Sequence, residues 1–397
     1  MTTKKKIRVL YIIGGDDDKY GAQRLAKTII SSLKTDNNIE FCVLITHHGL
    51  INTFCDEQRI ENHIFGFKYC TYVPMKNKLL SMLKHSAKKC FISLKNYQAI
   101  RQIEKEIDIR SFDIIHSNIN RDLIGGYFSQ KYQIPHIWHI QEMYDSHFGL
   151  SPIYKHQIEW MNSHCTKFIA ISNAVAVDWI NHGIAKSKVQ VIYNGIDIDK
   201  YHIIEKDQDD NILHIVMAGL IYREKGQEQV IEALTLLPQD IRDNVRLDLY
   251  GEAKEKYYSY LCQYIYQHDL QNIVTFKGYS NNMPEILPTY DVGINCSKSE
   301  GFGLSTLEYM ASGLCVLATK GGANTELIKD RQNGLLIDYG NPSSIAEKIK
   351  YIYHNRKEMM WFQRKAHEAS REYSIKTCAN KIYKVYEKVL GRNNSLG

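Results

Sequence analysis

Two glutamates in the segment 299–313 are the side chains of this sequence best suited to hold a molecule rich in hydroxyl groups. Glu300 and Glu308 stand eight positions apart in the run SEGFGLSTLEYMASG. The segment follows a predicted strand and opens a predicted helix, so that Glu300 lies in the loop and Glu308 one to two turns into the helix. Both carboxylates can then accept hydrogen bonds from sugar or ribose hydroxyls. The alternative is a chance pair in which Glu308 is an exposed helix residue.

The residues between these glutamates suit a phosphate. Gly301 and Gly303 flank Phe302, and glycine allows the backbone to approach a bound molecule closely. Leu304 and Ser305 begin the predicted helix, whose first N–H groups have no partner inside the helix and therefore favour an anion. These five residues are predicted to bind a phosphorylated ligand together with the glutamates.

A second segment, 219–226, carries two permanent positive charges after another predicted strand. Arg223 offers a planar fork of donors and Lys225 offers a point charge, and together they can neutralise a diphosphate leaving group. The order of residues does not match a Walker loop. Taken alone, the segment also fits a solvated basic turn; the glutamate segment favours the phosphate interpretation.

A histidine is a third candidate. Residues 138–142, with the sequence WHIQE, end a predicted strand on which His139 and Gln141 share one face, because side chains alternate along a strand. One interpretation has His139 contact the sugar or the leaving phosphate, and the other is a packed histidine at a strand end. His136 points to the opposite face, so the two histidines do not form a metal pair.

Short apolar runs alternate with helical stretches on both sides of a polar segment at 204–211. The predicted strands are 7–13, 41–46, 113–116, 136–140, 168–171 and 189–193 before this segment, and 212–218, 245–250, 273–276, 291–296, 315–319 and 334–338 after it. Such alternation predicts parallel sheets covered by helices on both faces. Parallel sheets bind ligands at the carboxyl ends of their strands, where both charged segments are expected.

The expected fold is therefore α/β, with two Rossmann-like domains that face each other across a cleft. The length of 397 residues suits two domains. Their predicted limits are 1–204 and 205–375. A helix is predicted over 376–397, and one possibility is that it crosses back to pack on the first domain.

Both charged segments, and with them most of the chain, resemble the retaining glycosyltransferases of the GT-B fold in the glycogen-synthase-like group, also called group 1. The E-x7-E element of that family corresponds to Glu300 and Glu308. The basic pair of its G-x5-K-G loop corresponds to Arg223 and Lys225. The resemblance implies that Glu308 contacts the nucleotide ribose and that Glu300 contacts the donor sugar ring.

Weaker parts of the same resemblance extend the expected donor site. Gly21 stands in the run YGAQR, which matches the family's glycine-rich loop in part, and Asn194 and Tyr279 stand in the runs NGID and GY. The second domain would bind a nucleotide-sugar donor and the first a glycan or lipid-linked acceptor. The resemblance further implies transfer of a hexose with retention of the anomeric configuration, in the synthesis of a bacterial surface polysaccharide or glycoconjugate.

Two other classes of function stay open. A nucleotide-sugar epimerase or phosphorylase shares this fold, although neither an added acid-base carboxylate nor a Schiff-base lysine in a longer chain is evident. A non-catalytic subunit at a membrane surface is the other alternative. The complete set of Arg223, Lys225, Glu300 and Glu308 speaks against it.

No metal and no cofactor are expected, because the basic pair can neutralise the diphosphate. The run Asp16 to Asp18 contains a D-x-D pattern, which holds a divalent ion in the other major transferase fold, but a solvated turn after the first strand is the preferred interpretation. Nine scattered cysteines without a CxxC pair argue against a zinc site and a disulfide framework. A reducing, cytoplasmic location follows.

The stretch 62–103 has a one-sided charge. It contains eight Lys or Arg residues and no Asp or Glu, and apolar residues interleave with the cations. No run in the sequence approaches the ~18 apolar residues of a membrane-spanning helix. Peripheral docking on an anionic membrane is therefore predicted, and a core helix with a basic outer face is the alternative. Nucleic acid is not an expected partner, because no recognition motif accompanies the charge.

Overall fold

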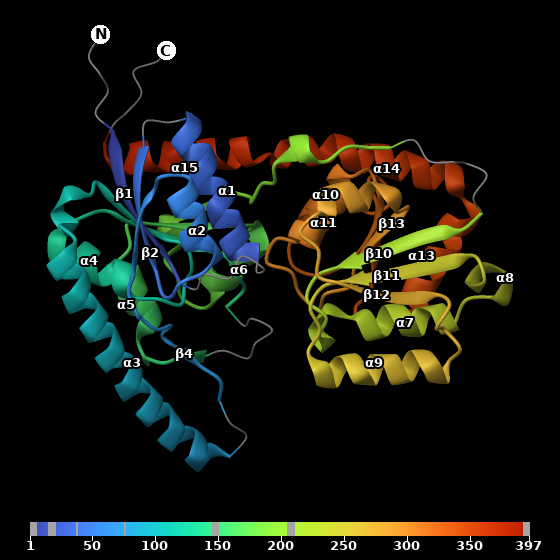
Figure 1. Cartoon of the computed structure of the whole chain (residues 1–397), viewed down its shortest axis with the longest axis horizontal. Helices are drawn as coiled ribbons and strands as arrows, with labels where there is room; N and C mark the ends of the chain where they lie inside the picture. Colours follow the sequence, from blue (N-terminus) through green and yellow to red (C-terminus); the bar gives the residue numbers. More distant parts are fainter. Residues whose placement is uncertain are drawn as a thin grey trace, which may run out of the picture. The chain divides into compact units, whose positions relative to one another are not determined.

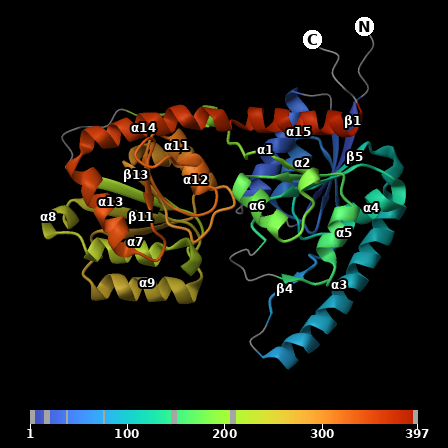
Figure 2. The same cartoon turned by 180° about the vertical axis from the view of Figure 1, so that it is seen from behind.

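The computed structural model describes residues 6–14, 21–36, 39–74, 77–144, 151–204 and 211–391. The chain divides into two compact units (Figure 1, and Figure 2 from behind). The first unit comprises Met1–Gly195 and Ile375–Gly397, and the second comprises Ile196–Ser374. Asp16 to Asp18 and most of the polar segment 204–211 lie outside the described residues.

The boundary between the units precedes the predicted limit at residue 204. The N–H of Ile196 donates to the carbonyl of Tyr373 at 3.1 Å. Ile203 packs so closely on Gly313 that a Cβ added to the glycine would lie 2.8 Å from the isoleucine side chain. Segment 196–204 therefore belongs to the second unit, although the predicted limits place it in the first domain.

The first unit is built on a seven-stranded sheet in which every neighbouring pair of strands is parallel. In sheet order the strands are β3 (Glu61–Ile64), β2 (Ile39–Ile45), β1 (Ile7–Ile13), β5 (Ile114–Ser117), β6 (His136–Ile140), β8 (Lys167–Ala170) and β9 (Val189–Val191). Its helices are α1 (Gly21–Asp36), α2 (Leu50–Glu57), α3 (Lys78–Glu106), α4 (Ile124–Tyr132), α5 (Gln157–Ser163), α6 (Asn173–Asn181) and α15 (Ile375–Val389). Two short strands, β4 (Thr71–Tyr72) and β7 (Ser151–Pro152), form a separate antiparallel pair.

Both faces of this sheet are buried, as expected for parallel strands. Tyr11 of β1 belongs to the cluster on the side of α1 and α15, where Ile382 and Tyr386 of α15 are fully buried. Leu10 of the same strand belongs to the opposite cluster, with α3 and α4. Helix α15 is thus part of the first unit's core, and each large apolar side chain that it buries contributes about 1.5–3 kcal/mol.

The second unit contains a six-stranded parallel sheet. In sheet order the strands are β12 (Val274–Gly278), β11 (Val245–Tyr250), β10 (Leu213–Ala218), β13 (Val292–Asn295), β14 (Cys315–Thr319) and β15 (Leu335–Ile337). The helices are α7 (Gln227–Thr235), α8 (Gln239–Arg242), α9 (Glu255–Gln267), α10 (Met283–Ile286), α11 (Leu304–Ala311), α12 (Asn324–Leu327), α13 (Pro342–His354) and α14 (Arg356–Ser370). The prediction of an α/β fold with two parallel Rossmann-like sheets is confirmed.

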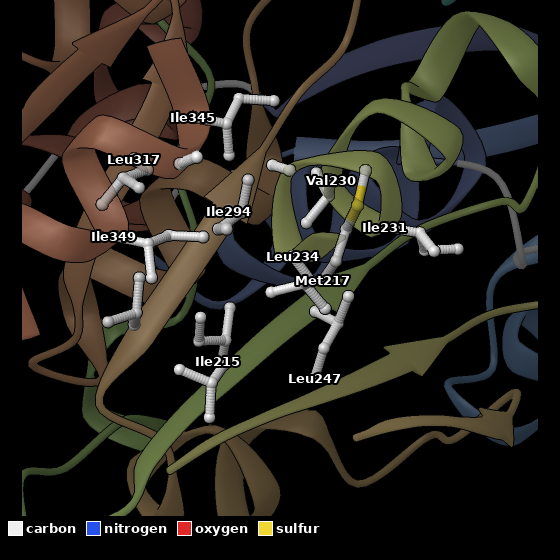
Figure 3. Close-up of a cluster of buried hydrophobic side chains, with 14 of the residues drawn as sticks. Ile215, Met217, Val230, Ile231, Leu234, Leu247, Ile294, Leu317, Ile345 and Ile349 are labelled. Atoms are coloured by element: carbon white, nitrogen blue, oxygen red, sulfur yellow. The ribbon is translucent and has the colours of Figure 1, made fainter. Parts of the chain in front are cut away.

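The core of the second unit lies between this sheet and helices α7 and α13 (Figure 3). Its labelled members are Ile215, Met217, Val230, Ile231, Leu234, Leu247, Ile294, Leu317, Ile345 and Ile349. The strand order reverses between β10 and β13, so the loops after these two strands leave the same edge side by side. Ligands of open α/β sheets bind at this switch point. Among the described residues, no helix is long and apolar enough to span a bilayer.

Candidate functional site

The two charged segments meet at the switch point of the second unit. The N–H of Lys298, after β13, donates to the carbonyl of Glu224, after β10, at 2.9 Å. Gly226 closes the loop after β10 with φ of 78°, and an added Cβ there would lie 2.2 Å from the carbonyl oxygen of Cys296. Only glycine permits this close approach, because a side chain would disfavour the backbone angle and collide with the neighbouring loop.

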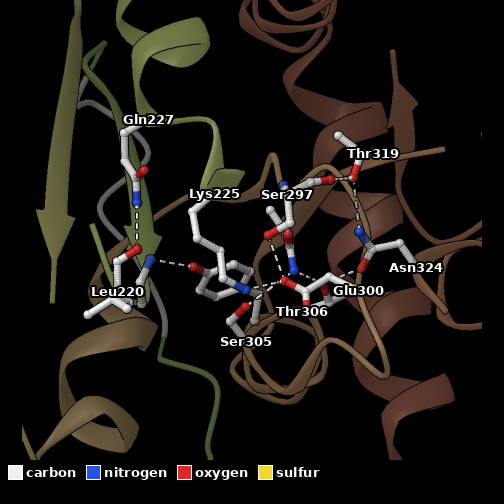
Figure 4. Close-up of polar contacts among 12 residues, drawn as sticks. Leu220, Lys225, Gln227, Ser297, Glu300, Ser305, Thr306, Thr319 and Asn324 are labelled. Atoms are coloured by element: carbon white, nitrogen blue, oxygen red, sulfur yellow. Dashed lines mark hydrogen bonds and ion pairs between the residues drawn. The ribbon is translucent and has the colours of Figure 1, made fainter. Parts of the chain in front are cut away.

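This contact places Lys225 against Glu300. The Lys225 Nζ lies 2.5 Å from the Glu300 Oε1, and the hydroxyl of Ser297 donates to the same oxygen at 2.6 Å (Figure 4). The side chains of Lys225 and Glu300 are 24% and 13% exposed. An ammonium and a carboxylate are therefore held together at the carboxyl-end edge of the sheet, partly shielded from water.

The backbone around Glu300 is held in place by glycines. Gly322 adopts φ of 57°, and an added Cβ there would lie 2.1 Å from the Glu300 carbonyl oxygen. That oxygen accepts a hydrogen bond from the N–H of Ala323 at 2.9 Å. Gly303, with φ of 85°, precedes the first residue of α11, and an added Cβ would lie 2.9 Å from the Asn324 side chain. Gly303, predicted from the sequence to let the backbone approach a ligand, and Gly322 thus bring segments of this unit together.

A chain of polar side chains under the loop fixes the start of α11 (Figure 4). The Asn295 amide donates to the Thr306 hydroxyl at 2.9 Å, and that hydroxyl donates to the Asn324 amide oxygen at 2.9 Å. Asn324 in turn donates to the Thr319 hydroxyl at 3.2 Å, which donates to the carbonyl of Ser297 at 2.7 Å. Buried polar networks of this kind hold one arrangement when each member finds partners. Sequence reasoning did not assign a role to these side chains, although Asn295 and Thr319 are the last residues of β13 and β14.

Glu308 lies on α11 and is only 5% exposed. The hydroxyl of Tyr201, in segment 196–204, donates to its Oε1 at 3.1 Å. This contact orients the carboxylate, and Tyr201 is a second residue that sequence reasoning missed. Glu308 is therefore not the exposed helix residue that the chance interpretation supposed, and its contact with a ribose stays a prediction.

The other predicted residues of this segment divide into packed and accessible positions. Phe302 is 3% exposed, and its ring lies 6.0 Å from the ring of Tyr373, so it serves the core. Gly301, Leu304 and Ser305 are partly exposed, and the Ser305 hydroxyl accepts from Asn295 at 3.3 Å. Backbone groups at the start of α11 therefore lie at an accessible edge of the sheet.

Arg223 and Tyr279 lie near the same edge but outside the Lys225–Glu300 pair. Arg223 is exposed and forms no ion pair with any described residue. Tyr279 follows β12 and is 43% exposed. Their donor contacts stay predictions.

In the first unit, a group of amides lies at the carboxyl ends of three strands. The Tyr11 hydroxyl donates to the Asn118 side-chain oxygen at 2.9 Å, and the Gln141 amide donates to the same oxygen at 3.4 Å. Asn194 is 3% exposed and donates to the Gln141 oxygen at 3.4 Å. Gly21 begins α1, and Asn118 donates to the next carbonyl along that helix, of Ala22, at 3.1 Å. Gly21 and Asn194 therefore lie at the same edge of the sheet as Asn118 and Gln141. Their predicted contacts with a donor stay predictions.

The predicted contact of His139 with a sugar or phosphate is not supported by its position. Its side chain is fully buried, and its ring lies 5.4 Å from that of His116 in an edge-to-face arrangement. The reason is that β6 is buried along its whole length, whereas Gln141 follows the strand end and is partly exposed. Neither ring nitrogen of His139 has a hydrogen-bond partner among the described residues.

Burial keeps three histidines of this unit neutral. It lowers the pKa of His139 to about 3 and of His136 to about 4, and it lowers the pKa of His116 well below 6.5. It also raises the pKa of Asp122 to about 7. Between about pH 5 and 6.5 the unfolded chain therefore binds three histidine protons that the native state rejects, while native Asp122 keeps one proton that the unfolded chain loses.

We expect the free energy of unfolding to be highest above pH 6.5 and to fall below it. The net difference of two protons contributes up to about 2.7 kcal/mol per pH unit. Urea unfolding at pH 7.5 and pH 5.0 measures this. The variant His139→Leu should show a shallower pH dependence and equal or greater stability at pH 7.5, because it removes two unpaired buried nitrogens. It should also keep its enzymatic rate; a large loss of rate in the folded variant would return His139 to the active site.

A metal site receives no support from the groups of ligand-type side chains. Within the described ranges, Cys42, Glu61 and His63 form the one group of three that could hold an ion. Burial raises the pKa of the Cys42 thiol far above its usual range, which disfavours the thiolate that a metal needs. The Glu61 carboxylate is already 3.2 Å from the His63 imidazole. The D-x-D run 16–18 is outside the described residues.

Parts of both units match known protein families. Residues 199–369 match the family described as glycosyl transferases group 1, and residues 81–200 match glycosyltransferase family 4. An uncharacterised glycosyltransferase of Methanocaldococcus jannaschii is 26% identical over 341 residues, which cover 83% of this chain and 90% of that protein. The N,N'-diacetylbacillosaminyl-diphospho-undecaprenol alpha-1,3-N-acetylgalactosaminyltransferase of Campylobacter jejuni is 21% identical over 325 residues, which cover 76% and 82%.

Solved structures give the same fold. The Anabaena protein HepE, determined with UDP and glucose, has a TM-score of 0.77 and 21% identity to this chain, and the match covers 96% of this chain and 100% of HepE. The two family models together run from residue 81 to residue 369. The chain therefore has the GT-B fold of glycosyltransferases, and its second unit matches the group 1 glycosyltransferase family over residues 199–369.

Proposed function

We propose that the protein transfers a hexose from a nucleoside-diphosphate sugar, with retention of the anomeric configuration, and that the donor binds at the switch point of the second unit. The observation that carries this proposal is the Lys225–Glu300 pair, 2.5 Å apart, next to the start of α11. A diphosphate needs positive charge and free N–H groups, and a sugar needs hydrogen-bond acceptors. This edge offers both.

In this proposal each charged side chain binds a particular part of the donor. Lys225 and Arg223 neutralise the diphosphate, and Glu300 accepts hydrogen bonds from sugar hydroxyls. Glu308, oriented by the Tyr201 hydroxyl, accepts from the ribose. When a donor binds, the Lys225 ammonium exchanges part of its contact with Glu300 for the phosphate, so that each charge keeps a partner. Pre-positioned charges stabilise a transition state without reorganising when the bond breaks.

Retention follows from attack on the same face of the sugar that the diphosphate leaves. The bond from the anomeric carbon to the phosphate oxygen breaks, the acceptor oxygen bonds to the carbon, and the leaving phosphate takes the acceptor proton. A covalent double displacement would need a carboxylate as nucleophile at the anomeric carbon. Glu300 is engaged by Lys225 and Ser297, which fits a binding role better.

The acceptor is proposed to be a glycan or a lipid-linked saccharide, and the pathway the synthesis of a bacterial surface polysaccharide or glycoconjugate. The Campylobacter relative supports the lipid-linked alternative, because its name describes transfer to a diphospho-undecaprenol saccharide. The polar edge of the first unit, with Asn118, Gln141 and Asn194, offers amide groups that suit hydroxyl-rich molecules.

The test of this function is a donor screen followed by analysis of the product. UDP-, GDP-, ADP- and dTDP-hexoses are compared by thermal shift, because a ligand that binds the native state raises its apparent stability. UDP-hexoses come first, since HepE is known with UDP and glucose. NMR of freshly released sugar then gives the anomer. Retention supports the proposal, whereas inversion, or the absence of turnover with each bound donor, contradicts it.

We also expect activity without a divalent metal ion, because Lys225, Arg223 and the start of α11 supply the positive potential. Transfer is measured after dialysis against EDTA, with and without added magnesium or manganese. Rates that survive chelation support this arrangement. Complete loss that manganese or magnesium restores would contradict it and would direct attention to Asp16, Asp17 and Asp18.

A further inference from the structure

Helix α3 (Lys78–Glu106) packs on the first unit through one narrow face, on which His85 of its first half hydrogen-bonds the carbonyl of Ile153 at 2.9 Å. Among the side chains of this helix that the structure describes, the buried ones are Ile92, Asn96, Ala99 and Ile103, which recur every three to four positions. The Asn96 side chain accepts from the Lys68 N–H at 2.6 Å and donates to the Lys68 carbonyl at 3.0 Å. In both views the first turns of the helix extend away from the unit's sheet (Figures 1 and 2). These first turns are therefore largely surrounded by solvent.

A second apolar face lies almost opposite the buried one. Leu80, Leu83, Ala87, Phe91 and Leu94 are spaced three or four positions apart, so at about 100° per residue they form one stripe along the helix. The four large side chains of this apolar stripe are 52%, 62%, 52% and 54% exposed. Single exposed apolar residues are common, but a continuous stripe marks a contact surface.

Positive charge flanks the apolar stripe on one side. Lys84, Lys88 and Lys95 are exposed and form no ion pair among the described residues. The first acidic residue along α3 is Glu104, which Arg101 approaches at 4.0 Å. A solvated helix face usually mixes both signs, whereas this one presents cations alone beside apolar side chains.

A cavity between β4 and α3 adds a site for an anionic group. It has a volume of about 170 Å³ and is lined by Tyr72, Val73, Ser81, Lys84 and Lys88. Two ammonium groups and hydroxyl groups are the donors that hold a phosphate. The cavity lies beside the apolar stripe, so one amphiphilic partner can occupy both.

We propose that this face of α3 docks on the surface of an anionic phospholipid bilayer, with the apolar stripe among the acyl chains and a lipid phosphate in the Lys84–Lys88 cavity. The exposed apolar side chains disfavour nucleic acid. A second copy of the chain would bring two faces of the same charge together. Anionic lipid satisfies both the charge and the apolar stripe. The inference goes beyond the donor site and fits a lipid-linked acceptor.

The structure also shows which apolar and basic residues of α3 do not belong to the proposed membrane-docking face. Ile92, one of the apolar residues that interleave with the cations of 62–103, is 2% exposed and packs in a buried cluster with Cys70 and Ile153. Lys89 lies 5.5 Å from the ring centre of Tyr154, away from the basic flank. The basic flank therefore consists of Lys84, Lys88 and Lys95.

The test is co-sedimentation of the full chain with phosphatidylglycerol or phosphatidylcholine vesicles at low and high salt. We expect binding to phosphatidylglycerol at low salt, weaker binding at high salt and little binding to phosphatidylcholine. Lys84→Glu combined with Lys88→Glu should lower the partition coefficient at least ~10-fold. The matched control, Lys350→Glu with Lys357→Glu, changes two exposed lysines of the second unit and should bind as the wild type does.

A second pair of variants tests the apolar stripe. Leu83→Ser with Phe91→Ser should also weaken binding, whereas Val177→Ser, at an exposed apolar residue of α6, should not. Donor hydrolysis by each variant shows that the protein is folded and separates this test from that of the catalytic proposal. Equal pelleting of the wild type and the Lys84–Lys88 variant, or no pelleting with phosphatidylglycerol at low salt, overturns the membrane proposal.

Discussion

Replacement of Lys225 by alanine is expected to lower sugar transfer at least ~100-fold without unfolding the protein. The loss follows because the Lys225 ammonium lies at the edge where the diphosphate is proposed to leave. The substitution also leaves the Glu300 carboxylate, which is 13% exposed, with the Ser297 hydroxyl in place of its cationic partner. The negative charge of Glu300, no longer neutralised by Lys225, would then repel the phosphate.

The matched control is Lys298→Ala. Lys298 lies on the adjacent loop and has an exposed side chain, so its removal changes the net charge equally but leaves the Lys225–Glu300 pair intact. We expect this variant to keep its transfer rate. Steady-state transfer rates of both variants show whether the loss is specific to Lys225, and circular dichroism verifies that both proteins are folded. Near-normal transfer by a folded Lys225→Ala protein would remove Lys225 from the catalytic site.

Glu308→Gln is expected to lower transfer by a similar factor, at least ~100-fold. The amide oxygen of glutamine can still accept the hydrogen bond that the Tyr201 hydroxyl donates at 3.1 Å, so the fold should persist. What disappears is the negative charge, and hydrogen bonds to a charged acceptor are about twice as strong as those between neutral groups. The loss should therefore reflect weaker positioning of the nucleotide.

Two further variants separate this role from general effects of charge and packing. Glu347→Gln removes an exposed carboxylate from α13 and should leave transfer unchanged. Tyr201→Phe removes the hydrogen bond but keeps the charge, so it should cause a smaller loss than Glu308→Gln. If Glu308→Gln and Glu347→Gln transfer sugar equally well, the ribose contact is excluded.

The alternation of strands and helices in the sequence was enough to predict the two parallel sheets, because apolar runs of this length can be buried in few other ways. The same pattern places Lys225 and Glu300 on loops at the carboxyl edge. It does not predict that β10 and β13 are neighbours, and this pairing is what brings the two side chains together. Their joint role could be inferred from the family resemblance before the contact was known.

The residues that support the site were not predictable in this way. Ser297, Asn324 and Tyr201 are of common types. Ser297 contacts Glu300 within the same loop, whereas Asn324 and Tyr201 contact residues 18 and 107 positions away along the chain. His139 shows the opposite difficulty. The two-residue period of a strand gives its face but not what covers that face, and α15, more than 200 positions later in the sequence, covers this side of the sheet.

The exposed surface of α3 could be predicted from the sequence only in part. The absence of acidic residues over 62–103 is visible in the sequence and indicates an anionic partner. The helix, however, carries two apolar faces, and sequence spacing does not distinguish the one that contains Ile92 from the one that contains Phe91. In the structure Ile92 is 2% exposed and Phe91 is 52% exposed, which shows that the face with Ile92 is the one that packs on the unit.

Calorimetric titration of UDP and of uridine into the wild type and Lys225→Ala tests the proposed donor site most directly. If the Lys225 ammonium neutralises the diphosphate, the variant should bind UDP at least ~10-fold more weakly, because a charge-assisted contact is lost, and should bind uridine as the wild type does. Equal UDP affinity of the two proteins would contradict the placement of the diphosphate beside Lys225 and Glu300.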